Sequence, residues 1–177
     1  MGQPNVTPFY LRLREAINQV EADYDFVVID CPPQLGYLTL SSLVAATGLL
    51  ITIIPNMLDV ASLSQYLSMA TSVLRVVANH GLTLNYDFQR YLLCRYEPSD
   101  GPQAQMTGFL RFNFGQRLMT ETFLKSTAIS DAGLRQMTLY EINRAEVNKN
   151  TLERALDSVN QVVDELETIM HKAWGRN

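Results

Sequence analysis

The run YDFVVIDCPP, residues 24–33, constrains the fold of this chain more than any other segment. A continuous apolar stretch that ends in an aspartate and is followed by two prolines is typical of a strand buried on both faces of a parallel sheet. We therefore predict a strand over residues 25–29, with Asp30 at the carboxyl end of that sheet. An ordinary turn or helix-capping aspartate is the alternative, and the pattern alone leaves both interpretations open.

A carboxylate at the end of such a strand is the Walker B position, which holds Mg²⁺ on a nucleotide whose phosphates lie in a G-x-x-x-x-G-K-[ST] loop. That loop normally comes first in the chain, yet the residues before Tyr24 contain a single glycine, Gly2. We therefore expect the carboxyl-terminal half of a nucleotide-dependent switch protein. Residues 31–36 combine two prolines with Gly36, which favours a stiff loop that responds to a γ-phosphate.

Beyond this segment, apolar runs alternate with helical patterns, which predicts βαβ units. The expected fold class is a three-layer α/β fold, with a mostly parallel sheet and helices on both faces, and residues 1–177 are expected to form one domain. Strands are expected over residues 25–29, 49–54, 88–95 and 118–123. Helices are expected over residues 7–23, 38–47, 59–80, 105–114, 131–135 and 146–174. The spacing in the last helix predicts these inward-facing residues: Leu152, Ala155, Val159, Val163, Leu166 and Met170.

Charge and composition exclude some classes of function. The net charge of −4 argues against a general nucleic-acid binder. Residues 105–150 carry six basic and four acidic side chains, a net charge of +2 that leaves −6 on the remainder. This asymmetry allows a basic patch, although scattered, solvated charges explain the same count.

The two cysteines, Cys31 and Cys94, lie far apart in the sequence. Zinc sites need clustered Cys and His ligands, so we expect buried free thiols rather than a metal site. No apolar run approaches the roughly 18 residues that a membrane span needs. We therefore expect a cytoplasmic protein with no membrane partner.

Four segments together resemble the ParA-type plasmid-partitioning ATPases, and among these the RepA proteins of combined partition and replication systems. They are residues 24–47, 49–67, 90–103 and 125–142, and the likeness extends from about Thr7 to Trp174. The resemblance implies the carboxyl-terminal half of a P-loop NTPase fold. For the complete protein it implies ATP with Mg²⁺, a sandwich homodimer and weak hydrolysis stimulated by a centromere-binding partition protein. It also implies nonspecific DNA binding and association with the bacterial nucleoid.

The same resemblance assigns candidate site residues. Asp30 matches the catalytic Walker B aspartate, which holds Mg²⁺ through water. Cys31, Pro32 and Pro33 match the second switch. Residues 125–131 match the loop near the adenine, so the nucleotide-binding candidates there are Lys125, Ser126 and Thr127. Leu124 stands where a phosphate loop needs glycine, so these three residues are not such a loop. The candidates for a DNA-facing surface are Arg111, Arg117 and Arg135, with ordinary surface arginines as the alternative.

These 177 residues depart from the family pattern in one large respect, because they contain neither its phosphate loop nor the aspartate of its first switch. Phosphoryl transfer depends on positioning and charge stabilisation, which that loop supplies. We therefore expect this chain alone to bind no ATP and to hydrolyse none. Two functions remain open. The chain is either a piece of a complete partition ATPase or a naturally truncated interaction module that regulates a partner ATPase or binds DNA without catalysis.

The missing segment also predicts self-association. The resemblance places the strand that leads into the phosphate loop between the expected strands 25–29 and 49–54. Unpaired backbone groups facing that slot would each cost about 1–3 kcal/mol if they were buried without partners. We expect the two strands either to pair directly or to be joined by a segment of a neighbouring chain.

Overall fold

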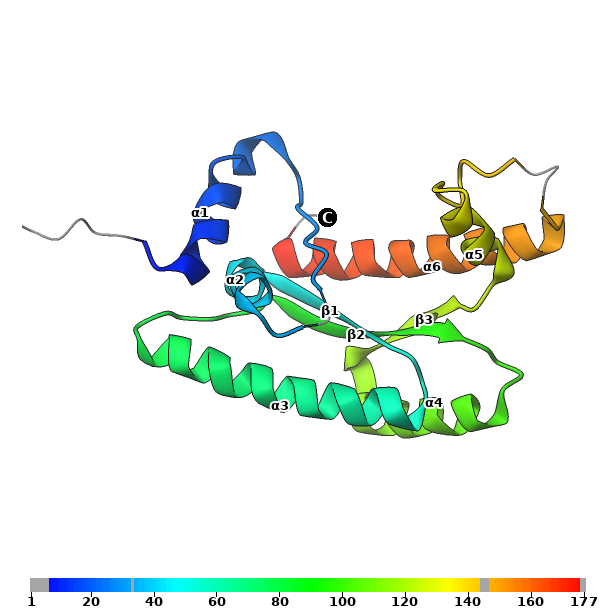
Figure 1. Cartoon of the computed structure of the whole chain (residues 1–177), viewed down its shortest axis with the longest axis horizontal. Coiled ribbons are helices and arrows are strands. Elements are labelled where there is room, and N and C mark those ends of the chain that lie inside the picture. The colour runs from blue at the N-terminus through cyan, green and yellow to red at the C-terminus, as the bar shows by residue number, and fades with distance from the viewer. Residues whose placement is uncertain (1–6, 33, 144–146, 176–177) are drawn as a thin grey trace, which may run out of the picture. The chain divides into compact units, whose positions relative to one another are not determined.

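The computed structural model describes residues 7–32, 34–143 and 147–175, which are traced in Figure 1. The chain divides into two compact units, unit 1 with residues 1–48 and 64–86 and unit 2 with residues 49–63 and 87–177. In chain order the elements, with η for a 3₁₀ helix, are η1 (Phe9–Leu11), α1 (Arg12–Asn18), η2 (Glu21–Asp23), α2 (Tyr37–Ala45), β1 (Gly48–Ile53), α3 (Met57–Asn79), β2 (Phe88–Tyr96), α4 (Gly101–Phe114), η3 (Gly115–Arg117), β3 (Leu118–Leu124), α5 (Thr127–Leu134) and α6 (Lys149–Trp174). The prediction of one domain over residues 1–177 stays a prediction.

Unit 1 is built mainly from helices. Its core joins α2 to the part of α3 that belongs to this unit, through the buried residues Leu40, Val44 and Val77. Two side chains donate hydrogen bonds to carbonyl groups at the end of α2. Arg14 donates to the carbonyl of Val44, and the Tyr86 hydroxyl donates to the carbonyl of Leu43 over 2.9 Å. These bonds satisfy carbonyl groups that the last turn of a helix leaves without partners inside the helix.

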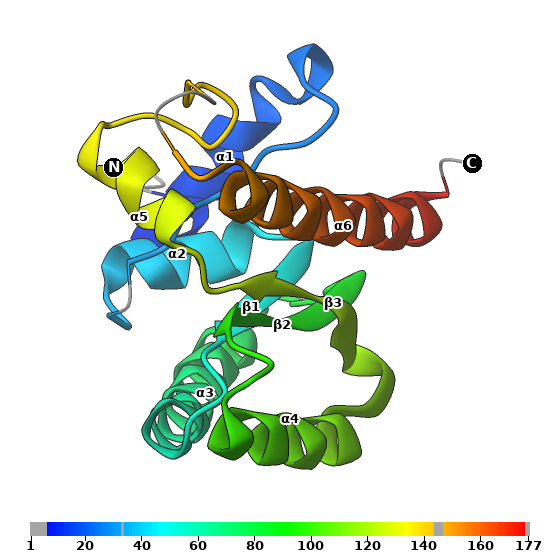
Figure 2. The ribbon, with the colours of Figure 1, turned by 90° about the vertical axis from the view of Figure 1, so that its right-hand side faces the viewer.

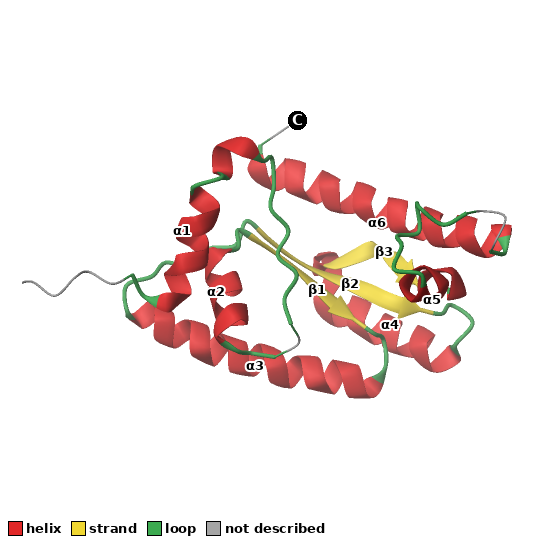
Figure 3. Cartoon of the chain, turned by 45° about the horizontal axis from the view of Figure 1, so that its top comes forward, coloured by secondary structure: helices red, strands yellow, loops and turns green. Residues whose placement is uncertain are grey.

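The strand predicted over residues 25–29 is wrong for this structure. The segment is loop, as Figure 3 shows in green. Its apolar side chains Phe26, Val27 and Val28 are exposed, as is Tyr24 just before it. A strand forms only where neighbouring strands pair with its backbone, and the described part of unit 1 contains no strand apart from Gly48 of β1. The expected direct pairing between residues 25–29 and 49–54 is therefore also absent among the described residues.

Unit 2 contains the sheet, and here the expected fold class is confirmed. The strand order is β1-β2-β3, and β2 pairs with β3 in parallel. Figure 2 shows α4 on one side of this sheet and α6 on the other. Successive residues of β2 pack against the two helix layers in turn, one on the α4 side and the next on the α6 side. The Tyr91 ring stacks on Phe114 at the end of α4, with 4.0 Å between the ring centroids, while Leu92 packs with Met119 of β3 and Val162 of α6.

The pairing of β2 with β3 is irregular in two places, and the second lies near its carboxyl end. Cys94 pairs with Phe123 and Tyr96 with Leu124, so Arg95 is an extra residue on β2. Its φ angle is 52°, in the left-handed region that residues with a Cβ atom rarely adopt. This combination is a β-bulge, which bends its strand and redirects the side chains that follow.

Several helices begin at other residues than expected, each at a polar cap. Asp100 accepts from the Gln103 amide, so α4 begins at Gly101 and not at residue 105. Ser126 accepts from the Ala128 amide, so α5 begins at Thr127 and not at residue 131. Asn148 caps α6, whose expected start at residue 146 lies outside the described residues. A side-chain acceptor at the helix start satisfies an amide that has no partner within the helix, which fixes each of these boundaries.

The buried face of α6 also differs from the prediction. Leu152 and Ala155 are buried as expected, but the face continues through Ser158 and Val162, and Val163 is 42% exposed. A serine on the buried face of a helix is unusual, and its hydroxyl is hydrogen-bonded to β3. The apolar spacing alone therefore misplaced the contact face by about one residue.

Candidate functional site

Asp30 lies in unit 1, in the extended loop between η2 and α2, and its side chain is exposed. No hydrogen bond or ion pair of its carboxylate is found among the described residues, which leaves both oxygens available to a ligand. The neighbouring Pro32 is exposed as well, and Pro33 lies outside the described residues. The carboxylate is thus accessible, but the structure does not place it at the end of a strand.

Cys31 corrects the expectation of buried thiols, because its side chain is exposed. It lies near Tyr66 of α3, where partial burial, and after it the charge of the Cys31 thiolate, raise the pKa of the tyrosine hydroxyl. Cys94 in β2 is half-buried, and this burial raises its pKa to about 11. The two thiols therefore have opposite environments, and no group of three His, Cys, Asp or Glu side chains that could hold a metal occurs in the described ranges.

The loop after Asp30 is held where it enters α2. The carbonyl of Gln34 accepts two hydrogen bonds, from the Gly36 amide at 2.9 Å and from the hydroxyl of the buried residue Thr39 at 2.5 Å. The segment that matches the second switch is thus anchored at its carboxyl end.

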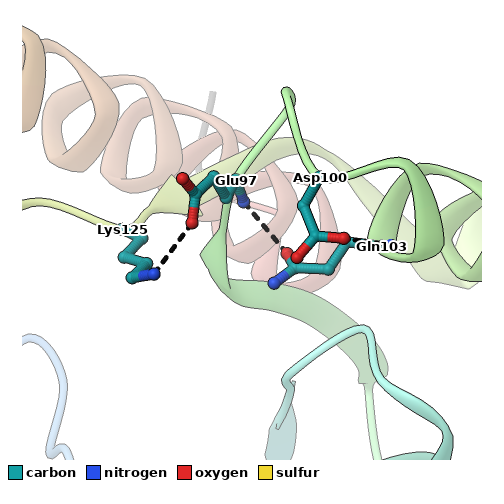
Figure 4. A network of polar contacts seen from close by, with 4 residues as sticks. All are labelled: Glu97, Asp100, Gln103 and Lys125. Carbon is teal, nitrogen blue, oxygen red and sulfur yellow. Dashed lines mark hydrogen bonds and ion pairs between the residues drawn. The ribbon is translucent and has the colours of Figure 1, made fainter.

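The carboxyl ends of β2 and β3 are joined by a polar network in unit 2, shown in Figure 4. The ammonium group of Lys125 lies 2.8 Å from a carboxylate oxygen of Glu97, and both side chains are about half-exposed. The side-chain oxygen of Gln103 accepts from the amide of Glu97, and Asp100 accepts from the amide of Gln103. The Lys125 amide donates to the carbonyl of Tyr96, so backbone and side chain together connect the two loops.

Lys125, Ser126 and Thr127 therefore lie together, and two of them have structural contacts. Lys125 is paired with Glu97, Ser126 caps α5, and Thr127 is the first residue of that helix. A pocket of about 270 Å³ adjoins all three and is completed by the first turns of α6, where Arg154 supplies a second cation. Two cationic side chains and several hydroxyl groups suit an anionic ligand. Glu97 was not predicted, although a polar loop at the end of a parallel strand next to β3 was a signal for it.

The three arginine candidates for DNA contact lie in unit 2 and have different environments. The guanidinium of Arg111 donates to the carbonyl of Thr120 over 3.2 Å. Arg117 ends η3 and is exposed, and Arg135 follows α5 as its cap residue. Arg111 thus has a contact within the fold. A DNA-binding role for the three arginines stays a prediction. A single site that contains both Asp30 and Lys125 also stays a prediction, because those two residues lie in different units.

The donor set fits Mg²⁺ bound with a nucleotide better than a metal held by protein alone. Mg²⁺ is usually bound by one or two carboxylates together with waters and substrate phosphates. Asp30 offers one accessible carboxylate, and no cluster of further ligands surrounds it in the described parts of the chain. No helix in those parts is long and apolar enough to cross a membrane.

Comparisons with known proteins agree with this architecture. A family model described as an AAA domain matches residues 5–84. A protein of Rhizobium rhizogenes named "Putative replication protein A" is 51% identical over 170 residues, which are 96% of this chain and 42% of that protein. The "Chromosome partitioning protein ParA" of Myxococcus xanthus is 55% identical over 40 residues, which are 23% of this chain and 14% of that protein.

The solved structure titled "Structure of Cyanthece apo McdA" matches with a TM-score of 0.61 and 19% identity, over 84% of this chain and 59% of that chain. At this identity the likeness concerns the fold. The chain spans about four tenths of the length of the replication protein A relatives that it matches. These similarities, to the replication protein A relatives over almost the whole chain and to ParA over a shorter segment, show that the chain is related to the ParA-type partition proteins and among them to the RepA proteins.

Proposed function

We propose that this chain supplies the carboxyl-terminal part of an ATP-dependent plasmid partition protein of the ParA and RepA type. The observation that carries the proposal is the 51% identity to a replication protein A relative over 96% of this chain, a span that includes Asp30 and the joined loops of β2 and β3. The complete protein would bind ATP with Mg²⁺, dimerise and position plasmids in the bacterial cytoplasm, in association with the nucleoid.

In this proposal each candidate residue has one role. Asp30 holds Mg²⁺ through a water molecule, and residues 31–33 form the switch that follows it. The loop of Lys125, Ser126 and Thr127 lies beside the nucleotide. The accessible carboxylate of Asp30 and the cationic pocket beside Lys125 support these roles. When bound, Mg²⁺ neutralises charge on the phosphates, and the protein positions the reacting groups.

Titration of the 177-residue chain with Mg-ATP tests whether nucleotide binding needs the phosphate loop in addition to Asp30. We expect no binding tighter than the millimolar range and no hydrolysis, because Asp30 works with a phosphate loop that these 177 residues do not contain. The complete protein should bind, and its Asp30→Asn variant should lose hydrolysis while a control with the exposed Asp23→Asn substitution keeps it. Sub-millimolar binding of Mg-ATP to the 177-residue chain would contradict the proposal.

DNA binding is a separate part of the proposal. A few arginines that reach phosphates together would give weak, sequence-independent binding that falls steeply with salt. Replacing Arg117 and Arg135 with alanine in the complete protein should lower the affinity for unrelated DNA sequences equally, while Arg75→Ala on α3 serves as the control. Unchanged affinity, or a marked preference for one sequence, would show that another surface binds DNA.

The partners follow from the same assignment: a second copy of the complete protein, a centromere-binding partition protein and nonspecific DNA. Sequencing the genomic DNA directly upstream separates this proposal from a naturally truncated, non-catalytic interaction module. A continuing reading frame that encodes a phosphate loop supports the partition ATPase, whereas an in-frame stop codon directly before Met1 supports the module.

A further inference from the structure

β3 lies at one edge of the sheet, and its outer backbone groups are not free. The order β1-β2-β3 leaves one side of β3 without a neighbouring strand among the described elements. An edge of this kind presents a row of N–H and C=O groups that invites pairing with another chain. Here the row is occupied by side chains.

Glu165 of α6 satisfies two of the amides. Its two carboxylate oxygens accept from the Thr120 amide at 2.9 Å and from the Glu121 amide at 2.8 Å. Hydrogen bonds to an ionised acceptor are stronger than those between neutral groups. Two consecutive amides can share one acceptor here because the register of β3 against β2 shifts between Leu118 and Thr122. One carboxylate thus satisfies the outward amides of this irregular part of the edge.

Ser158 and Arg111 satisfy the groups on either side. The Ser158 hydroxyl donates to the Thr122 carbonyl at 2.8 Å and accepts from the Leu124 amide at 2.9 Å. Arg111 of α4 donates to the Thr120 carbonyl. Ser158 is 4% exposed, so its two bonds are part of the packed contact between α6 and β3.

We propose that Arg111, Ser158 and Glu165 act as a substitute for a strand that closes the β3 edge, and that their removal converts this edge into a pairing surface for a second copy of the chain. The outward groups of Thr120, Thr122 and Leu124 include both donors and acceptors, so two such edges complement each other when they run antiparallel about a twofold axis. Threonine and phenylalanine favour strands, which suits β3 to this pairing.

Glu165 also opposes an incoming strand by its charge. A strand that replaced it would have to displace the carboxylate or bury it without a cation, and an unpaired buried charge is costly. Inward-pointing charges are one of the ways in which natural sheets prevent pairing at their edges. Among the three side chains, Glu165 should therefore have the largest effect on association.

The first test uses Glu165→Ala in the 177-residue chain, with Glu167→Ala as the control. This control removes an equal charge from an exposed position of the same helix, and no hydrogen bond from Glu167 to β3 occurs among the described residues. At a protein concentration where the variant is monomeric, hydrogen exchange of the Thr120 and Glu121 amides should become at least about tenfold faster in Glu165→Ala only. Sedimentation equilibrium should show association at least about tenfold tighter than that of the unchanged chain. Unchanged exchange, or faster exchange without tighter association, overturns the proposal.

The second test locates the association. Thr120→Pro removes one of the outward donors of β3, and proline is tolerated at the outer side of an edge strand. Added to Glu165→Ala, it should return the association constant to that of the unchanged chain. Association that persists in the double variant is at another surface and overturns the proposal.

Ser158→Ala provides the same test if circular dichroism shows that Glu165→Ala does not fold. This substitution removes both hydroxyl bonds while it adds no volume to the buried contact. In the dilute monomer, exchange at Leu124 should become faster, and at higher concentration association should be tighter, whereas Ser72→Ala, on an exposed part of α3, should change neither. An unchanged Leu124 amide in the folded Ser158→Ala variant overturns the proposal.

Discussion

Two runs of this chain differ in outcome although the sequence predicts a strand for both. Residues 25–29 and strand β2 each contain a run of β-branched, aromatic or leucine residues. β2 pairs in the sheet and buries Leu93 completely, whereas residues 25–29 are loop and leave Val28 80% exposed. The difference shows that an apolar run is suited to a buried strand but becomes one only where neighbouring strands pair with it.

The largest expected effect contrasts a side chain in each run. Leu93→Ala removes a fully buried side chain and should lower the free energy of unfolding by about 2–5 kcal/mol. Val28→Ala removes an exposed side chain and should change it by less than about 0.5 kcal/mol. Urea unfolding of both variants measures the contrast, and equal losses would mean that residues 25–29 are packed in solution.

The reactivity of the two cysteines tests the same contrast between an exposed segment and a strand of the sheet. Burial holds the pKa of Cys94 at about 11, so at pH 8 only about one in a thousand of its thiols is a thiolate, the reactive form. A chromogenic disulfide reagent should therefore label the exposed Cys31 at least about a hundredfold faster than Cys94. Cys31→Ser should remove the fast phase and Cys94→Ser the slow one. Labelling of both thiols in a single kinetic phase would show that the two environments do not differ in this way.

The same pKa gives a dependence of stability on pH. The Cys94 value in the fold exceeds the ordinary value of 9.0, so the folded protein holds this proton more tightly than the unfolded chain does. Its contribution to stability is complete below about pH 9 and is lost as the pH rises towards 11. Chemical unfolding at several pH values should show this loss in the unchanged chain and a smaller loss in Cys94→Ala.

The smallest effect is expected for the pair of Lys125 and Glu97. Both side chains are about half-exposed, and pairs of this kind stabilise by about 0–1 kcal/mol and are weakened by salt. A double-mutant cycle of Lys125→Met and Glu97→Gln measures their coupling. Coupling well above 1 kcal/mol would show that the joined loops hold the carboxyl end of the sheet more firmly than the exposure of the pair implies.

The sequence predicted most elements of unit 2, because the signals for β2, β3 and α6 are local. Alternating or periodic apolar positions and nearby turn residues need no knowledge of distant partners. The fate of residues 25–29 could not be predicted in this way, since it depends on which strand lies beside them. The helix starts were missed where Asp100 and Ser126 act as caps, although both residue types are favoured at helix starts.

The candidate site was predictable in part. The resemblance named Asp30 and the loop at Lys125 as candidates, and their roles stay predictions. The structure adds that Lys125 has a partner in Glu97. That pair depends on the register of β2 against β3, which local patterns do not contain. The polar contacts of Ser158 and Glu165 were missed for the same reason, because they depend on how α6 lies against an edge strand.

The bulge at Arg95 has a consequence for how the length of this region can change. Arg95 is an extra residue on β2, so it shifts the register of the residues that follow it. This register places the Tyr96 carbonyl beside the Lys125 amide and the Glu97 carboxylate beside the lysine ammonium group. Most surface loops tolerate a gained or lost residue. Here, a deletion of one residue would restore regular alternation and turn Glu97 to the opposite face of the sheet. We therefore expect an insertion or deletion between Cys94 and Glu97 to disturb the contact of Glu97 with Lys125 more than a substitution of Arg95 does.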